Sequence, residues 1–268
     1  GPYQAAHQML RAHSLAVELY RTRFAGQSGR IGLTANCDWR EPLTSATQDR
    51  EAAQRALEFI LGWFGDPLWF GRYPESMRSR LGERLPRFSD RDRELLKGSS
   101  DFFGLNHYTT HYAAGAPGKE PAGEGCDPDA DIEAAFSLDP AWPRTAMGWA
   151  IVPRGLNRLL HWIDSRYSRP EIVITENGCA MDDRLEEGRV DDQGRIDYFK
   201  GYLAACHQAI TAGVHLTGYF AWSLLDNFEW ASGYGKRFGR HYVDFATQQR
   251  LPKSSAAWFR RLIADNGF

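Results

Sequence analysis

Residues 172–178 read Ile-Val-Ile-Thr-Glu-Asn-Gly, and the interpretation of the whole chain starts from this stretch. Four apolar or β-branched residues precede Glu176, and an Asn-Gly turn signal follows it at once. This pattern is typical of a buried parallel strand that ends at the carboxylate. The carboxyl ends of parallel strands carry the chemistry in α/β proteins, so Glu176 is a catalytic candidate. The alternative is a carboxylate that only caps a turn or a helix at the end of the strand.

The composition is that of a folded protein without a marked charge. At 268 residues and 43% hydrophobic content, the chain can bury a large core in one domain or two. A net charge of −2 indicates neither a nucleic-acid partner nor an anionic membrane surface. No apolar run approaches the ~20 residues of a membrane span. Nine Trp, eleven Tyr and fifteen Phe supply flat apolar faces of the kind that stack on sugars.

Cysteine and histidine usage gives no sign of a metal site. The four cysteines are scattered, with no C-x-x-C pair and no metal-ligand spacing. They suggest free thiols in a reducing compartment, which favours a cytoplasmic protein, although one disulfide is compatible with the count. The histidines also lack metal-ligand spacing, so we expect neither a metal nor another cofactor. The chain opens with Gly-Pro-Tyr and not with Met, which leaves room for a targeting segment upstream.

Strands and helices alternate along the chain after a first helix over residues 3–24. Four strand–helix units are predicted, over residues 30–64, 101–167, 171–212 and 215–265. This alternation predicts an α/β fold with a parallel sheet. A complete (β/α)8 barrel (a TIM barrel) needs eight such units in ~250 residues. Because only four are found, we expect half of such a barrel.

The remaining segments fit a single domain over residues 1–268. Residues 113–141 are rich in Gly, Pro, Ala and Asp, and we expect one long surface loop there, not a linker between domains. A small hairpin is predicted around Tyr242 and Arg250, before a last helix at 254–265.

Two motifs match a known family. Residues 175–178, Thr-Glu-Asn-Gly after an apolar run, resemble the nucleophile signature of glycoside hydrolase family 1, the β-glucosidase family. Residues 219–230, Tyr-Phe-Ala-Trp-Ser-Leu-Leu-Asp-Asn-Phe-Glu-Trp, resemble its final-strand motif almost letter for letter. Supporting matches occur at residues 32–36, 62–67, 73–74, 103–108 and 147–149. The resemblance runs from end to end of the chain, but it covers only the C-terminal half of the family's barrel, with strands that match the fifth to the eighth.

The resemblance implies a role for each matching residue. Glu176 would be the nucleophile that forms the glycosyl–enzyme intermediate, and Tyr108 would donate its hydroxyl to Glu176 and keep it anionic and aimed. The sugar would be held by residues in six positions: Asn106 lining the site, Trp149 as the platform for the leaving group, Trp222 under the ring, Glu229 on two hydroxyls, Trp230 donating its indole N–H to another hydroxyl, and Phe238 beside the exocyclic hydroxymethyl. Ala150 departs from the acidic residue that many relatives carry there, which leaves the leaving-group preference open.

These roles also agree with the chemistry of the residues themselves. A buried carboxylate that must bond a pair of hydroxyls rejects sugars that lack the pair, because its desolvation is then uncompensated. Taken singly, Trp222 and Trp230 are better explained by core packing. Glu229 lies between aromatic residues in the sequence, and a carboxylate is almost never buried without a partner.

The proton donor of such an enzyme is missing from the chain. A retaining glycosidase uses two carboxylates ~5–5.5 Å apart, one as nucleophile and one as acid/base. The family carries its acid/base Glu in an Asn-Glu-Pro motif at the end of the fourth strand, and this chain has no such motif. Arg40-Glu41-Pro42 is similar, but it follows the strand that matches the fifth, and Arg40 replaces the Asn. We therefore expect retaining β-glucosidase chemistry on a β-glucoside or related sugar, with the acid supplied by an N-terminal half, and no activity of this chain alone.

Two other interpretations stay open. Two copies of the chain could close a barrel as a homodimer, with two Glu176 carboxylates in one lumen. The chain could instead be a non-catalytic carbohydrate-binding or scaffold half-barrel. Free strand edges and an unpaired apolar inner face favour a partner in every case. The sequence leaves undetermined the sugar, the leaving group, the oligomeric state and the compartment.

Overall fold

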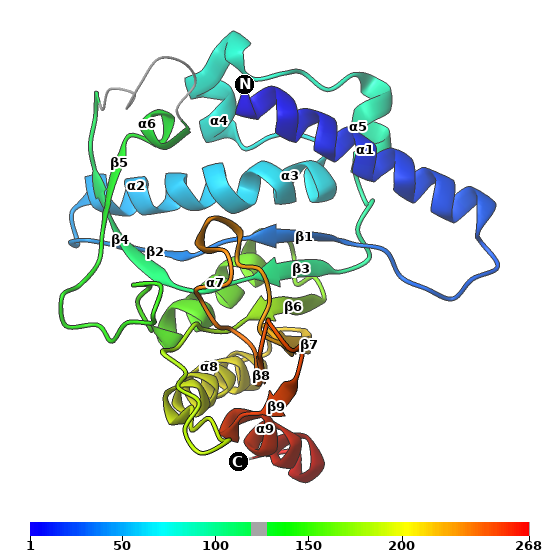
Figure 1. The fold of residues 1–268 in the computed structure, drawn as a ribbon. Helices are drawn as coiled ribbons and strands as arrows, with labels where there is room; N and C mark the ends of the chain where they lie inside the picture. The colour runs from blue at the N-terminus through cyan, green and yellow to red at the C-terminus, as the bar shows by residue number, and fades with distance from the viewer. Residues whose placement is uncertain (119–127, 268) are drawn as a thin grey trace.

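The centre of the fold is a four-stranded parallel sheet. In the computed structural model, which describes residues 1–118 and 128–267, its strands follow the order β1-β3-β6-β7 (Figure 1). Their bounds are Leu33–Asn36 for β1, Phe103–Asn106 for β3, Ile172–Asn177 for β6 and Leu216–Ala221 for β7. The predicted α/β fold with a parallel sheet is confirmed, and β1 and β7 form the two edges of this sheet.

The strand register places the candidate residues at one end of the sheet. β1 and β3 pair in a regular register, with Asn36 opposite Asn106. The pairing of β3 with β6 slips after Leu105, so that Asn106 lies opposite Glu176. The pairing of β6 with β7 shifts after Ile172 and again after Ile174, and the second of these shifts brings Asn177 opposite Ala221 near the strand ends. Such irregularities re-aim side chains, and those after Leu105 and Ile174 lie where the strands end.

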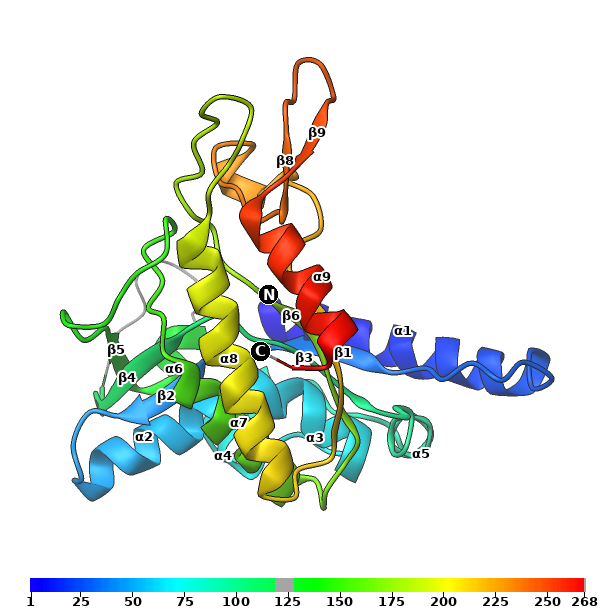
Figure 2. The ribbon, with the colours of Figure 1, turned by 90° about the horizontal axis from the view of Figure 1, so that it is seen from below.

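Helices precede, connect and follow these strands. Their bounds are α1 Pro2–Arg23, α2 Thr47–Leu57, the π-helical turn η1 Glu58–Gly62, α3 Trp63–Phe70, α4 Glu75–Leu81, the 3-10 turn η2 Gly82–Arg84, α5 Asp90–Leu96, α7 Pro153–Arg166, α8 Gln193–Thr211, the 3-10 turn η3 Trp230–Ser232 and α9 Ser254–Asp265. Figure 2 shows α7, α8 and α9 as neighbours, with α1 extending away from them. None of the helices in the described ranges is long and apolar enough to cross a bilayer.

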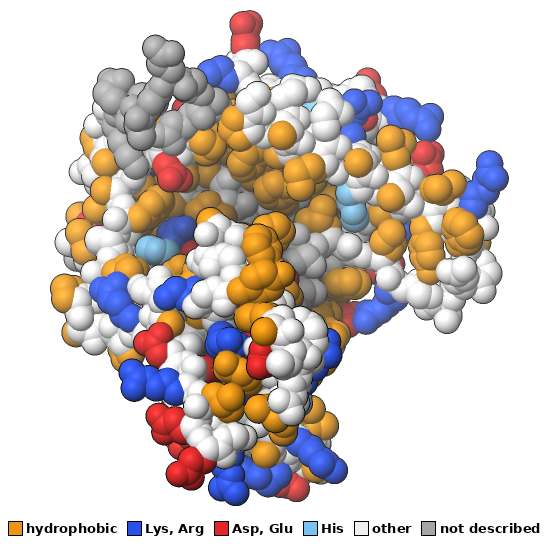
Figure 3. Space-filling model, viewed as in Figure 1, with side chains coloured by type: hydrophobic (Ala, Val, Ile, Leu, Met, Phe, Trp, Pro, Cys, Tyr) orange, Lys and Arg blue, Asp and Glu red, His pale blue; other side chains and the backbone are white. Residues whose placement is uncertain are grey.

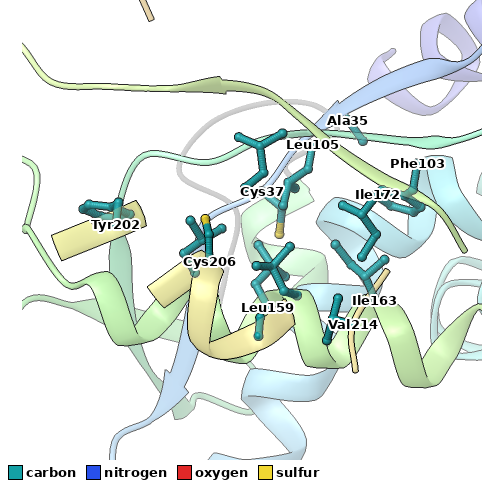
Figure 4. Close-up of a cluster of buried hydrophobic side chains, with 14 of the residues drawn as sticks. Ala35, Cys37, Phe103, Leu105, Leu159, Ile163, Ile172, Tyr202, Cys206 and Val214 are labelled. Carbon is teal, nitrogen blue, oxygen red and sulfur yellow. The ribbon is translucent and has the colours of Figure 1, made fainter. Parts of the chain in front are cut away.

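The main core lies between one face of the sheet and these helices. α7 begins with Pro153 at its first turn and buries Leu156, Leu159, Leu160 and Ile163, which recur at helical spacing. Alternate strand residues, such as Leu105 and Ile172, pack against the same cluster as Leu159 and Ile163 (Figure 4). Because side chains alternate along a strand, the polar residues between them face the other side of the sheet. There the Thr175 hydroxyl donates to the Asn106 side-chain oxygen at 2.7 Å.

The expectation of one long loop over residues 113–141 is corrected. The strand β4 (Thr110–Gly115) continues into this range, and the short helix α6 (Pro128–Ile132) and the strand β5 (Ala134–Ser137) lie within it. β4 pairs in parallel with β2 (Trp39–Pro42) and antiparallel with β5. Small residues such as Ala113 and Ala134 are fully buried in this second sheet, which explains why the composition read as a loop. Residues 119–127 lie outside the described part of the chain.

A buried network of charges joins the C-terminal segments. The predicted hairpin is present as β8 (His241–Val243) and β9 (Arg250–Pro252). Just beyond it, the ammonium of Lys253 lies 2.8 Å from Asp226 and 2.5 Å from Asp183. The guanidinium of Arg195 on α8 lies 2.8 Å from Asp183 and also contacts Asp192. The side chains of Arg195 and Lys253 are fully buried, so these pairs fix the loops after β6 and β7 against α8 and α9.

Removing Arg195 should destabilise the fold strongly. Arg195→Met keeps most of the side-chain volume but leaves Asp183 and Asp192 buried with one cationic partner fewer. Breaking a buried pair in this way costs about 3–5 kcal/mol. Urea unfolding followed by circular dichroism should show this loss, while Arg184→Met, an exposed arginine of the same loop, should stay within about 0.5 kcal/mol of wild type. Equal midpoints for the two variants would contradict the role of the network.

Candidate active site

The site is built around a hydrogen bond between Tyr108 and Glu176. Glu176 is the fifth residue of β6, and Tyr108 follows β3 in the connection to β4. The Tyr108 hydroxyl donates to Oε2 of Glu176 at 2.5 Å. Burial raises the pKa of Tyr108 far above its ordinary value, and the hydrogen bond to Glu176 and the charges of Glu176, Glu229 and Asp38 add to this. The phenol therefore stays protonated and acts as a donor at neutral pH.

Backbone hydrogen bonds beyond the strand ends hold this pair in place. The three acceptors are backbone carbonyl oxygens. The N–H of Cys37 donates to that of Asn106 at 2.9 Å, the N–H of His107 to that of Glu176 at 3.0 Å, and the N–H of Trp222 to that of Asn177 at 2.9 Å. Each bond links the segment after one strand to the strand or segment beside it. The carboxyl ends of all four strands of the main sheet are therefore tied together on both sides of Glu176.

Glu229 and Trp222 form the second part of the site. Trp222 directly follows β7, and its side chain hydrogen-bonds the Glu229 carboxylate. Burial raises the pKa of Glu229; the hydrogen bond from Trp222 opposes this, and the nearby charge of Glu176 adds to it. Two carboxylates thus lie close enough to influence each other, one bonded to a phenol and one to an indole. In such an arrangement one carboxylate can attack an electrophilic carbon, while the other accepts hydrogen bonds from neighbouring hydroxyls.

Three aromatic rings pack beside the nucleophile candidate. The Tyr108 ring lies 5.3 Å from Trp149 and 6.2 Å from Phe238, and Trp149 lies 5.9 Å from Phe238, all measured between ring centroids. Phe238 is only 2% exposed. Its ring therefore supports Tyr108 and Trp149 from behind in this structure, and the predicted contact with a hydroxymethyl group stays a prediction.

Of the two remaining predicted site residues, Asn106 lies at the end of the sheet and Trp230 is exposed. Asn106 lies at the end of β3 opposite Glu176, with its side chain bonded to Thr175 as described above. Trp230 begins the turn η3, directly after Glu229 in the chain, and is 80% exposed. The structure thus brings Asn106, Tyr108, Trp149, Glu176, Trp222, Glu229 and Phe238 to the carboxyl ends of the strands, whereas Trp230 projects into solvent.

Gly178 allows the strand ends to approach each other. A Cβ atom at this position would lie 1.7 Å from the carbonyl oxygen of Trp222. No side chain fits there, so the Asn177-Gly178 turn brings the backbone of Trp222 directly against the end of β6. The glycine that marked the turn in the sequence is needed for this contact as much as for the turn itself.

Sequence reasoning missed the support behind the site. The Asn177 side chain donates to the His107 carbonyl at 2.7 Å and to the Tyr198 hydroxyl at 3.0 Å, and it accepts from the Tyr219 hydroxyl at 2.6 Å. Tyr198 belongs to α8, and Tyr219 belongs to β7. The signal was present, because a buried Asn beside a catalytic candidate must satisfy all its hydrogen bonds. Its partners come from distant positions in the chain, which one sequence does not pair.

No metal is needed to explain these contacts. Within the described ranges, no group of three His, Cys, Asp or Glu side chains is placed to hold a metal ion. Cys37, Cys179 and Cys206 are free and buried, and burial raises the pKa of each thiol to about 12. These three cysteines therefore behave as small apolar core residues.

A family description matches the entire chain. The model described as glycosyl hydrolase family 1 matches residues 1–268. Beta-glucosidase 4 of Oryza sativa subsp. japonica is 46% identical over 268 residues, which are 97% of this chain and 56% of that protein. Beta-glucosidase 42 of Arabidopsis thaliana is also 46% identical, over 98% of this chain and 55% of its own length. The chain thus spans just over half the length of these relatives.

Solved structures give the same picture. The crystal structure of the rice Os3BGlu6 β-glucosidase superposes with a TM-score of 0.91 at 40% identity, over 97% of this chain and 57% of that chain. The family 1 β-glucosidase of Thermotoga maritima superposes with a TM-score of 0.87 at 39% identity, over 98% and 56%. The Thermotoga maritima enzyme has also been solved in complex with deoxynojirimycin.

The buried His107 should make the fold sensitive to acid. Burial lowers the pKa of His107 to about 4, against 6.5 in the unfolded chain, and its Nδ1 is bonded to the Cys37 carbonyl. The unfolded state therefore binds a proton between pH 6.5 and 4 that the folded state does not. The free energy of unfolding should fall by on the order of 3 kcal/mol across this window, and no further below it from this group.

The measurement is urea unfolding at several pH values from 7 to 4. His107→Gln should flatten part of the fall in the free energy of unfolding. His111, whose pKa burial also lowers to about 4, contributes to the remainder, as do His7 and His13, whose pKa values burial lowers as well. His161→Gln, an exposed histidine of α7, should keep the wild-type slope. A wild-type slope in His107→Gln would show that His107 is not buried neutral.

Proposed function

Because the chain belongs to glycosyl hydrolase family 1, we propose that it forms the C-terminal half of a (β/α)8 barrel that hydrolyses β-glucosides with retention. Glu176 is the nucleophile, and the acid/base residue comes from an N-terminal half that completes the barrel. The observation that carries the proposal is the Tyr108–Glu176 hydrogen bond, formed beside Glu229 at the carboxyl end of a parallel sheet. This is the edge at which parallel α/β barrels place their active sites.

The chemistry follows from the positions of these groups. The Glu176 carboxylate attacks the anomeric carbon, the bond to the leaving oxygen breaks, and a covalent glycosyl ester forms. The acid of the N-terminal half protonates the leaving oxygen. The same residue then takes a proton from water as the water attacks the ester, so that the configuration is retained. Tyr108 holds the carboxylate in line before attack, and its fixed position spares the cost of orienting it later.

Glu41 does not replace the missing acid. It lies on β2, where it accepts a hydrogen bond from the Trp39 indole at 2.7 Å and contacts Arg158. Partial burial raises its pKa, but the hydrogen bonds from Arg158 and Trp39 outweigh this, and the pKa ends below its ordinary value. A general acid needs the opposite shift, so that it keeps its proton near neutral pH.

The sugar contacts are assigned to the side chains that line the same end of the sheet. Glu229 accepts from two hydroxyls, with Trp222 stacked under the ring and Trp149 on the leaving-group side. Asn106 lines the inner wall beside Tyr108. The exposed Trp230 indole donates to a further hydroxyl once the sugar is bound. Phe238 backs the rings of Tyr108 and Trp149, which its burial supports.

The open edge of the sheet supports the need for a second half. Within the described residues, the backbone of β1 has a strand on one side only. Residues of β1 line a hollow of about 410 Å³ together with apolar side chains of η1 and α3. Figure 3 shows hydrophobic side chains gathered on this face. An unpaired edge beside an apolar hollow is where another strand would add. A second copy of the chain could fill it too, but it would bring no acid.

The proposal predicts hydrolysis only in the assembled barrel, meaning this chain joined to the N-terminal half of a relative such as Beta-glucosidase 4. The assembled barrel should release the aryl group of an aryl β-glucoside and give the β-sugar as first product by NMR. Glu176→Gln should lower kcat by more than about 10⁴-fold. The isolated variant should keep the circular dichroism spectrum of the wild-type chain.

The isolated chain provides the opposing outcomes. Robust hydrolysis by this chain alone would show that the acid lies within it. If light scattering gives a monomer at micromolar concentration, the homodimer is excluded. Calorimetric binding of glucose or cellobiose by the isolated chain, with no hydrolysis in the assembled barrel, would favour the non-catalytic binding module.

A further inference from the structure

We propose that Asp38 is a positioning residue, which holds the backbone of Tyr108 and Thr109 and thereby sets the Tyr108 hydroxyl against Glu176. The inference rests on the proposed function, because it assigns Tyr108 a task in catalysis. It adds a residue that the sequence analysis did not single out. Asp38 lies between the end of β1 and the start of β2.

Tyr108 needs such a support because it is not part of a strand. β3 ends at Asn106 and β4 begins at Thr110, so residues 107–109 form a connection outside both strands. The place of the phenol therefore depends on what holds this connection. A small shift of a catalytic group reduces the rate of turnover even when the group itself is intact.

The segment Cys37–Trp39 supplies several of these supports. The Asp38 carboxylate accepts from the backbone N–H of Thr109 at 3.3 Å and from that of Tyr108. On either side of it, the Cys37 carbonyl bonds His107 Nδ1 at 2.9 Å, and the N–H of Trp39 donates to the Thr109 carbonyl at 3.2 Å. Among these four contacts, only those of Asp38 come from a side chain of Cys37–Trp39, so Asp38 can be changed without altering the backbone.

Asp38 is itself fixed in place. Its Oδ2 lies 3.9 Å from Arg40 and 3.8 Å from His111, and the three side chains are only 11–26% exposed. The Arg40 guanidinium packs over the Phe136 ring at 4.7 Å. Because burial keeps His111 neutral above pH about 4, the cationic partner of Asp38 is Arg40. Asp38 thus lies between Arg40 on β2 and the connection 107–109, which carries Tyr108.

An amide should not do the same work as the carboxylate. A carboxylate offers acceptors on both oxygens, which suits two backbone N–H groups and a guanidinium. Asparagine has one acceptor oxygen, and its NH₂ group would face a backbone donor or the Arg40 cation. Asp38→Asn therefore keeps the size of the side chain while removing part of the grip on Tyr108 and Thr109.

A double-mutant cycle in the assembled barrel tests whether Asp38 acts through Tyr108. Asp38→Asn should lower kcat about tenfold with little change in KM. In a Tyr108→Phe background, the same substitution should have almost no further effect, because the hydroxyl it positions is gone. Asp244→Asn is the matched control, since Asp244 also accepts from two successive backbone N–H groups in the turn between β8 and β9, and its kcat should stay unchanged. Equal losses from Asp38→Asn in both backgrounds would overturn the proposal.

A second measurement on the chain alone does not depend on activity. With ¹³C-labelled tyrosine, the Tyr108 ring signal is assigned by its absence in Tyr108→Phe. In Asp38→Asn it should move in the direction seen in Glu176→Gln, where the charged acceptor is removed. An unmoved signal in Asp38→Asn would overturn the positioning role even if the assembled barrel hydrolyses glucosides. If the signal moves in the isolated chain but the assembled barrel shows no hydrolysis, the positioning role is supported and the proposed function is the part that failed.

Discussion

The site depends on hydrogen bonds that continue past the ends of the strands. In a parallel sheet the ladder normally stops where the strands diverge, and the loops beyond are free to move. Here Cys37, His107 and Trp222 each donate from just beyond a strand to the carboxyl end of a neighbouring one. The backbone of Glu176 is therefore held from both sides, which would spare the proposed nucleophile most of the cost of being ordered before attack.

The electrostatics of the site depend on the same contacts. Two carboxylates that approach each other in a partly buried place each favour the neutral form of the other. At Glu229 the Trp222 indole opposes this effect, while Glu176 accepts a hydrogen bond from the Tyr108 hydroxyl. Away from the site, charges of opposite sign are paired and buried, as between Arg195 and Asp183.

Much of this arrangement follows from the sequence, because its elements are local. The apolar run before Glu176 and the Asn-Gly after it predict both the strand and its end. The helical spacing of Leu156, Leu159, Leu160 and Ile163 likewise predicts α7. Long-range pairings are not local in this way. β4 and β5 were hidden by small residues, and the roles of Asn177 and Asp38 depend on partners that only the folded chain brings together.

Gly178 shows how strictly backbone packing limits the chain at this point. Its Cα lies so close to the Trp222 carbonyl that even one methyl group would overlap it. Neither partner can yield, since one is the end of β6 and the other directly follows β7. In a library that samples all twenty residues at every site, position 178 would tolerate a single amino acid. The reason would be steric, although the position lies only two residues after Glu176 in the chain.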